Sequence, residues 1–300
     1  MNLQNILTEK RNPRTFNIDT LSSLDILSVI NQEDHLVPQA VEKILPQIAQ
    51  MVDHIVESFK KGGRLIYVGA GTSGRLGVLD ASECPPTFGT DPSMVIGLIA
   101  GGEKALQFAL EGAEDDRDAA TNDITELAVS NLDVVVGIAA SGRTPYTIEA
   151  MKTAKSFGAK TGAIMCSHGR EMEEAADVVM LIETGPEAVT GSTRLKAGTA
   201  QKLVLNMLTT ASMIRIGKVF SNLMIDVQPT NEKLRERAKL IVAEATGVSL
   251  EVASEALALF EDTKGAILYL LTGKEASQIQ FALSNHGGHL KNALHDLLKN

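Results

Sequence analysis

The chain has 300 residues, 44% of them hydrophobic, and a formal net charge of −9. This content can fill one large domain, or a main domain and a smaller one. The acidic balance, with no basic stripe, argues against nucleic acid and anionic membranes as partners. The two cysteines, Cys84 and Cys166, predict no disulfide framework. Because the first 20 residues lack an apolar core, we expect no signal peptide and a cytoplasmic protein.

Helices are expected in the N-terminal part of the chain. Ser22 or Ser23 can cap a helix that runs to residue 31. A longer helix is expected over residues 37–61, where apolar residues recur at helical spacing. We assign residues 1–56 to an N-terminal helical segment.

From residue 64 onward, apolar strands alternate with helices. Continuous Val, Ile and Leu runs separated by helices are typical of a parallel sheet buried on both faces, so the predicted fold class is α/β. The main domain is assigned to residues 57–220. The expected strands cover residues 64–69, 94–100, 132–139, 160–165 and 178–182. One helix is expected to begin at residue 74, and three more are expected over residues 115–129, 145–157 and 193–219.

The pattern changes after Gln228-Pro229. No strand is expected beyond this point, and a small C-terminal all-α domain is assigned to residues 229–300. Its three or four short amphipathic helices are expected at about residues 231–245, 249–260, 263–271 and 275–298. Within the long helix before it, the apolar stretch 203–216 is interrupted by polar residues, so it predicts a buried helix and not a membrane span.

Two glycine and hydroxyl loops directly follow expected strands. The first is Gly-Ala-Gly-Thr-Ser-Gly at residues 69–74, and the second is Ala-Ser-Gly-Arg-Thr at residues 140–144. A strand that ends in small residues and leads into a helix leaves backbone N–H groups at the positive end of the helix dipole, which favours an anion. Together the loops predict a site for a small phosphorylated metabolite. The candidate phosphate ligands are Thr72, Ser73, Gly74, Ser141, Gly142 and Thr144.

The first loop also fits the dinucleotide-binding pattern Gly-x-Gly-x-x-Gly. That interpretation needs an acidic residue at the end of the second strand to hold a ribose. Asp91 has roughly the right spacing, but it precedes the next apolar strand. The dinucleotide interpretation is therefore disfavoured. A purely structural role, in which the glycines only form tight turns, can explain either loop alone. It is a poorer explanation for both loops together with their hydroxyl residues.

Carboxylates follow each of the first two strand–loop units. Glu83 precedes Pro85-Pro86 one short helix after the first loop, and we expect the prolines to place it beside apolar surface, where a carboxyl group can act as an acid. Glu114 and Asp115 open the helix that follows the second strand, at the edge where open parallel sheets collect ligands. The alternatives are a solvated loop acid for Glu83 and helix-dipole stabilisation for the other pair.

Several long motifs appear in a recognisable order. They are the strings of residues 69–86, 111–115, 139–145 and 185–202, with Thr-Glu-Lys-Arg-Asn-Pro at residues 8–13 and His-Gly-Gly at residues 286–288. Over almost the whole chain this set resembles the N-acetylmuramic acid 6-phosphate etherases, a family of the sugar isomerase (SIS) domain superfamily. The resemblance implies a SIS-type, flavodoxin-like three-layer domain. SIS domains commonly pair, so it also implies a homodimer with sites near the interface.

The resemblance implies that water cleaves the D-lactyl ether of N-acetylmuramic acid 6-phosphate, in amino-sugar catabolism and murein recycling. The steps are C2 deprotonation, lactate elimination and water addition, with no metal and no cofactor. Glu83 is implied as the proton donor and Glu114 as the base, with Asp115 as the alternative base. Ser192 and Lys196 are candidates to complete the sugar site, although a surface role for the lysine is equally compatible.

Two other functions are compatible with these motifs. A sugar-phosphate-sensing regulator of the same superfamily would keep the phosphate loops without the acid. A sugar phosphate isomerase would also remove a C2 proton, but it would need no acid placed at a C3 ether. His286 and His289 have a spacing that can bind metal, but no third ligand is near them in the sequence. We therefore expect a glycine turn there and no metal.

Overall fold

The structure is a computed structural model that describes residues 7–226, 232–260 and 262–299. The chain divides into two compact units, one formed by Met1–Ser82 with Pro92–Thr210 and the other by Glu83–Asp91 with Ala211–Asn300. The second unit includes residues 83–91 and 211–228 besides the helical domain expected from residue 229. In the described part of the chain, no helix is both long and apolar enough to cross a bilayer.

Five parallel strands form the central sheet in the order β2-β1-β3-β4-β5. This is the flavodoxin-like order, and the chain reverses direction across the sheet between β1 and β3. Gly69 at the end of β1 is opposite Ile99 of β2 and Ile138 of β3. The parallel sheet is therefore confirmed. The strands are β1 (Leu65–Gly69), β2 (Val95–Ile99), β3 (Val134–Ile138), β4 (Lys160–Met165) and β5 (Val178–Leu181).

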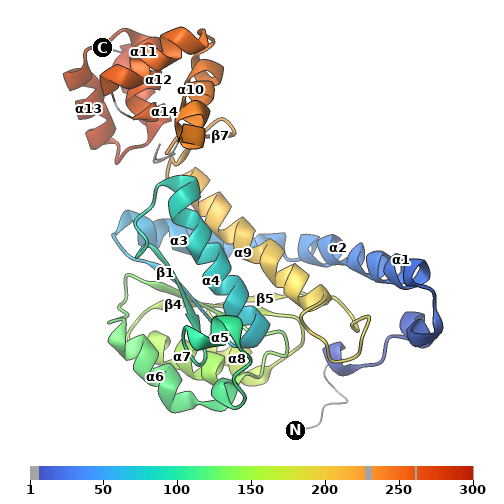
Figure 1. The fold of residues 1–300 in the computed structure, drawn as a ribbon. Coiled ribbons are helices and arrows are strands. Elements are labelled where there is room, and N and C mark those ends of the chain that lie inside the picture. The colour runs from blue at the N-terminus through green and yellow to red at the C-terminus, as the bar shows by residue number, and fades with distance from the viewer. Residues whose placement is uncertain (1–6, 227–231, 261, 300) are drawn as a thin grey trace. The chain divides into compact units, whose positions relative to one another are not determined.

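Helices cover both faces of the sheet (Figure 1). On one face lie α6 (Arg117–Glu126), α7 (Pro145–Ser156) and α8 (Arg170–Ala175), and on the other lie α3 (Leu45–Lys60), α4 (Gly71–Phe88) and α9 (Lys196–Arg215). Strand glycines allow this close packing. A Cβ atom at Gly137 of β3 would lie 2.2 Å from Met151 Sδ of α7, and one at Gly162 of β4 would lie 2.5 Å from Met51 Sδ of α3.

The N-terminal segment contains shorter helices than expected. Three 3-10 turns (Leu7–Glu9, Pro13–Thr15 and Ile18–Thr20) precede α1 (Ser23–Asp34) and α2 (Leu36–Glu42). The single helix expected over residues 37–61 is wrong, because α2 ends at Glu42 and α3 begins at Leu45. Pro46 is in the first turn of α3. A proline there is compatible with a helix start and incompatible with a helix interior.

Helix α4 is longer than expected. The short helix followed by a proline-stiffened segment is in fact one helix of 18 residues, with Pro85 and Pro86 inside it. The prolines fall near its end, so their missing N–H groups remove only the last backbone hydrogen bonds. Two short helices, α5 (Lys104–Gln107) and α8, were not expected from the sequence.

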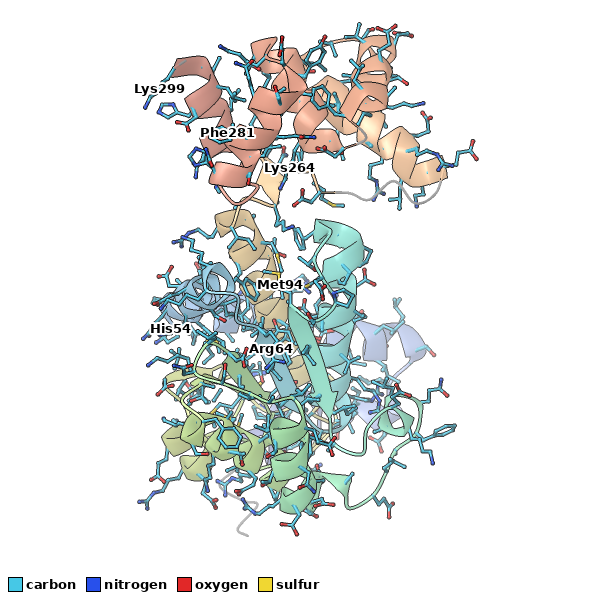
Figure 2. All side chains as sticks on the ribbon, turned by 90° about the vertical axis from the view of Figure 1, so that its left-hand side faces the viewer. His54, Arg64, Met94, Lys264, Phe281 and Lys299 are labelled. Carbon is cyan, nitrogen blue, oxygen red and sulfur yellow. The ribbon has the colours of Figure 1, made fainter. Side chains whose placement is uncertain are left out.

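The second unit is helical, as expected. It has its own apolar core, which includes Val242, Ile267 and Ile279, and Phe281 and Lys299 mark two of its helices in Figure 2. The single helix expected over residues 275–298 is wrong, because Gly287 and Gly288, with φ of +57° and +78°, separate two helices. The elements are a hairpin of β6 (Val219–Phe220) and β7 (Leu223–Met224), followed by α10 (Glu232–Thr246), α11 (Leu250–Phe260), α12 (Thr263–Thr272), α13 (Ala276–Asn285) and α14 (Leu290–Lys299).

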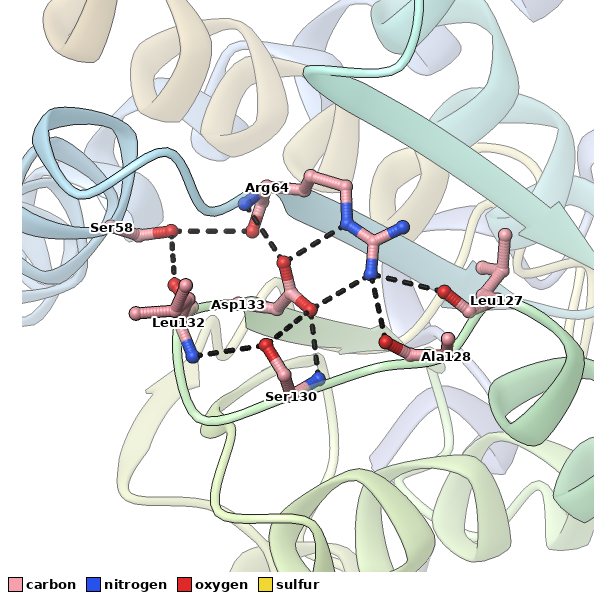
Figure 3. A network of polar contacts seen from close by, with 7 residues as sticks. All are labelled: Ser58, Arg64, Leu127, Ala128, Ser130, Leu132 and Asp133. Carbon is pink, nitrogen blue, oxygen red and sulfur yellow. Dashed lines mark hydrogen bonds and ion pairs between the residues drawn. The ribbon is translucent and has the colours of Figure 1, made fainter.

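A polar network fixes the amino edge of the sheet, where Arg64 and Met94 precede β1 and β2 (Figure 2). The Arg64 backbone N–H and Nε both donate to Asp133 Oδ1 at 3.0 Å, and Nη2 donates to Oδ2 at 2.8 Å (Figure 3). Ser130 N–H also donates to Oδ2. Burial acts to raise the pKa of Asp133, but the hydrogen bonds from Arg64 and Ser130 outweigh it and lower the pKa. This network joins β1 to β3.

Candidate active site

The loop between β1 and α4 depends on its glycines. Gly71 has φ of +53°, a conformation that favours glycine. A Cβ atom at Gly74 would lie 2.6 Å from the Gly69 carbonyl oxygen and 2.6 Å from Ile99 Cγ1. The start of α4 therefore packs directly on the end of β1, and the first N–H groups of the helix lie at the carboxyl edge of the sheet.

The hydroxyl residues of this loop contact helix α9. The Ser73 hydroxyl donates a hydrogen bond of 2.9 Å to Gln201 Oε1, and both side chains are buried. Thr72 Cγ2 lies 3.5 Å from the position that a Cβ atom at Gly198 would occupy. The loop is therefore supported from behind by α9, and the Ser73 hydroxyl already has an acceptor within the protein.

The second loop, between β3 and α7, is close to the first because β3 pairs directly with β1. The Ser141 hydroxyl oxygen accepts a hydrogen bond from Arg143 N–H at 3.2 Å, which shapes the turn. Gly142 has φ of +66°, and a Cβ atom there would lie 2.3 Å from Met165 Cε. Thr144 precedes Pro145, the first residue of α7. The two predicted phosphate loops thus leave neighbouring strands at one edge of the sheet.

The carboxylates that follow β2 differ in their surroundings. Glu114 and Asp115 belong to a 3-10 helix, Ala113–Asp115, that follows Gly112 in the left-handed conformation. Both are exposed, and within the described residues neither has a hydrogen-bond or ion-pair partner. Asp116 instead caps α6, because its side chain accepts a hydrogen bond from Ala119 N–H at 2.8 Å. The N-cap of α6 is thus Asp116 and neither of the two candidate bases.

A cavity of about 260 Å³ joins the first loop to Glu114. Arg75 contributes a positive charge to its wall and is held there by hydrogen bonds from Nε to the Leu106 carbonyl and from Nη2 to the Phe108 carbonyl. The cavity thus places a cation, a helix N-terminus and a carboxylate around one space. Its lining residues are Ala70, Gly71, Arg75, Ala100, Ala105, Phe108, Ala109, Leu110, Glu111, Gly112, Ala113 and Glu114.

Glu83 is exposed and lies in the second half of α4. Its side chain is therefore open to solvent, and its placement beside apolar surface stays a prediction. Ten residues separate it from Ser73 along a continuous helix, a rise of about 15 Å. The proposed proton donor is thus not part of the cavity that Glu114 lines.

Lys196 is not a surface lysine. It is fully buried at the start of α9, and its Nζ donates to Glu33 Oε2 of α1 at 2.7 Å. Glu33 also pairs with Arg14. Buried Glu187 accepts hydrogen bonds from the backbone N–H groups of Lys196 and Ala197, so it caps α9. Burial raises the pKa of Glu187 despite these bonds. Ser192 lies half-buried in the turn that precedes this helix.

Sequence reasoning missed several residues of this region. Gln201, Glu33 and Glu187 were not singled out, although Gln201 and Glu187 belong to the motif at residues 185–202. The contacts of Gln201 and Glu33 join positions 128 and 163 residues apart, so no local pattern reveals them. In the second unit, His286 Nε2 contacts Asp296 Oδ2 at 2.8 Å. Among the described residues no cluster of three His, Cys, Asp or Glu side chains could hold a metal.

Comparisons with known proteins bear on the fold and the family of this chain. Residues 47–155 match the glucokinase regulatory protein N-terminal SIS domain family, and residues 118–211 match the SIS domain family. A phosphoheptose isomerase from Neisseria gonorrhoeae has a similar fold, with a TM-score of 0.50 at 17% identity over 64% of this chain and 98% of that one.

Full-length relatives are much closer. The chain is 56% identical over 297 residues to an N-acetylmuramic acid 6-phosphate etherase from Aliivibrio fischeri, covering 99% of each chain. It is 57% identical over 293 residues to one from Brucella anthropi, covering 97% of this chain and 95% of the relative. The chain therefore belongs to the N-acetylmuramic acid 6-phosphate etherase family.

Proposed function

We propose that this protein is an etherase that cleaves the D-lactyl ether of N-acetylmuramic acid 6-phosphate with water. The products are N-acetylglucosamine 6-phosphate and D-lactate, and the reaction serves amino-sugar catabolism and murein recycling. The observation that carries the proposal is the cavity that joins the β1–α4 loop to Glu114, in a chain more than half identical to named etherases over nearly its whole length.

The chemistry needs a base, an acid and an anchor for the phosphate. An alkyl ether is a poor leaving group, but the open-chain sugar has an aldehyde at C1 that acidifies the C2 proton. A base removes this proton, the C3–oxygen bond breaks, and a proton is added to the departing lactate oxygen. Water then adds across the unsaturated aldehyde, with oxygen bonding to C3 and a proton returning to C2. General acid–base catalysis of this kind contributes about 10²–10⁴-fold.

The cavity is lined by Gly71, Arg75 and Glu114, whereas the six candidate phosphate ligands lie beside it and are not among its lining residues. Thr72, Ser73 and Gly74 lie in the first turn of α4, where N–H groups and the helix dipole favour a phosphate, and Arg75 adds a positive charge. Ser141, Gly142 and Thr144 come from the neighbouring strand. Glu114 is the proposed base because it lines the cavity, and Asp115 is not among the lining residues. Anchoring the phosphate lowers the entropic cost of bringing C2 to the base.

We further propose that the protein is a homodimer. Leu24 and Leu27 of α1 are 74% and 63% exposed, and Phe16 and Leu21 just before them are also exposed. Such a set of apolar side chains is more typical of an interface than of a free surface. Pairing would also allow Glu83 of one chain to serve the substrate held by its partner, which is consistent with its position far along α4 from Ser73. A phosphorylated sugar does not cross membranes freely, so we place the activity in the cytoplasm.

The proposal is tested by incubating the purified protein with N-acetylmuramic acid 6-phosphate in D2O. We expect stoichiometric D-lactate and N-acetylglucosamine 6-phosphate, with deuterium at C2 and one solvent oxygen at C3 when H2¹⁸O is used. A sugar phosphate isomerase would exchange C2 without releasing lactate, and a sensing regulator would bind the substrate unchanged. Either of these results would refute the etherase assignment.

A further inference from the structure

Gln201 is a buried amide at the carboxyl edge of the sheet. It lies on α9 and is 1% exposed, and its Oε1 accepts the Ser73 hydroxyl at 2.9 Å. Among the residues that the structure describes, none pairs with Gln201 Nε2. An unpaired buried donor is unfavourable and rare in folded proteins. Helix packing alone therefore does not explain a glutamine at this position.

With Gln201 in this orientation, the hydroxyl hydrogen of Ser73 is donated to Gln201 Oε1 and is not available to an anion. A serine hydroxyl has one hydrogen and two acceptor lone pairs. When the hydrogen is donated to Gln201, the side that faces the β1–α4 loop offers only lone pairs. A phosphate dianion also offers only acceptors. In this orientation Ser73 can therefore bind the phosphate through its backbone but not through its hydroxyl.

A half-turn of the Gln201 amide reverses this polarity. Rotation about the last side-chain torsion exchanges Oε1 and Nε2 with almost no change in shape. Nε2 then donates to Ser73 Oγ, and the Ser73 hydrogen becomes free to point into the loop. The group left unpaired is now a carbonyl oxygen, which proteins tolerate better than an unpaired N–H. Helix α9 need not move, because Gly198 keeps it against Thr72.

We propose that Gln201 is a positioning residue for phosphate binding, whose amide turns so that the Ser73 hydroxyl becomes a donor to the phosphoryl group. The inference rests on the proposed function, because it assumes a phosphorylated ligand in the β1–α4 loop. It adds a residue from α9 that acts through Ser73 and does not touch the substrate. It also predicts a ligand-dependent exchange of hydrogen-bond direction inside an otherwise rigid loop.

The test is titration of the full chain with inorganic phosphate by calorimetry. Q201M keeps the length of the side chain but cannot donate, and we expect about three- to tenfold weaker binding. Q201E can only accept when ionised, so it holds the Ser73 hydrogen inward and adds a negative charge. We expect about ten- to hundredfold weaker binding for Q201E. T209V is the matched control, because it removes a different buried hydrogen bond of α9, from Thr209 to Asp80, and should keep wild-type affinity.

A double-mutant cycle separates positioning from a general structural role. If Gln201 acts through Ser73, Q201M has no further effect on phosphate affinity in an S73A background. The proposal is overturned if Q201E binds phosphate as well as wild type or better than Q201M, if the Q201M effect persists with S73A, or if wild type shows no saturable phosphate binding. If the wild-type protein releases no D-lactate but phosphate affinity still falls from wild type to Q201M to Q201E, the etherase reaction is refuted and this inference stands.

Discussion

The two edges of the central sheet are built differently. At the amino edge, Arg64 and Asp133 satisfy each other and the neighbouring backbone in one network (Figure 3). At the carboxyl edge, Glu114 has no partner within the described residues, and the buried Gln201 nitrogen is left without an acceptor. Polar groups that pair with each other stabilise a fold, whereas polar groups left available can bind a ligand. We therefore assign stability to the amino edge and propose that the chemistry takes place at the carboxyl edge.

The largest expected effect is at the carboxyl edge. Glu114→Gln removes the proposed base, so we expect both D-lactate release and C2 deuterium exchange to fall by about 10²–10⁴-fold. Asp115→Asn should change either rate much less, because Asp115 does not line the cavity. The control is Asp118→Asn, another exposed acid nearby. If Asp115→Asn abolished exchange and Glu114→Gln did not, the base would have to be reassigned to Asp115.

The next effect is on stability at the amino edge. Asp133→Ala removes the acceptor of two backbone N–H groups, those of Arg64 and Ser130, and the counter-ion of the Arg64 guanidinium. We expect a loss of about 2–4 kcal/mol in the free energy of unfolding. Urea denaturation measures this loss. Because the change is remote from the cavity, kcat and KM of the folded fraction should stay at wild-type values. A large rise in KM without loss of stability would contradict the division between the two edges.

The buried carboxylate Glu33 predicts a pH dependence of stability. Hydrogen bonds from Arg14, and then from Lys196, lower the pKa of Glu33 to about 2. Since the folded pKa lies below the ordinary value of 4.5, this stabilisation is complete above that value and is lost as pH falls toward 2. We expect a loss of roughly 2–3 kcal/mol over this range.

The matched measurement for Glu33 is the free energy of unfolding against pH for wild type and Glu33→Gln. The variant should be less stable at neutral pH, because Lys196 loses its buried counter-ion. Its stability should fall less steeply below pH 4.5 than that of wild type. Parallel curves for the two proteins would show that Glu33 is not the titrating group.

The smallest expected effect is at Asp116, beside the proposed base. Asp116→Ala removes the cap of α6 and should lower the free energy of unfolding by about 1 kcal/mol. The C2 exchange rate should remain that of wild type. Loss of C2 exchange in this variant would mean that the acidic residues 114–116 act together, and that Glu114 alone does not account for the chemistry.

The sheet and the positions of the two loops could be predicted from the sequence. Buried runs such as Val134–Ile138 have few alternatives to a strand, and the glycines at residues 69–74 mark a turn that only small residues permit. Helix boundaries are harder to predict from the sequence. The division between α2 and α3 had a signal in Pro46, whereas the continuation of α4 through Pro85 and Pro86 had none.

The support behind the candidate site was not predictable. The contacts of Ser73 with Gln201 and of Lys196 with Glu33 depend on how α9 and α1 pack against the sheet domain. Each residue alone resembles an ordinary polar residue of a helix. Lys196 was a candidate for the sugar site because of its motif, and its burial in an ion pair became visible only in three dimensions.

The most direct test of the difference between the edges is hydrogen–deuterium exchange with and without N-acetylglucosamine 6-phosphate. We predict slower exchange in peptides that cover residues 70–75, 110–115 and 140–145, and no change in those that cover residues 57–64 and 127–134. Protection at the amino edge, or no protection at the three carboxyl-edge segments under saturating ligand, would contradict the account.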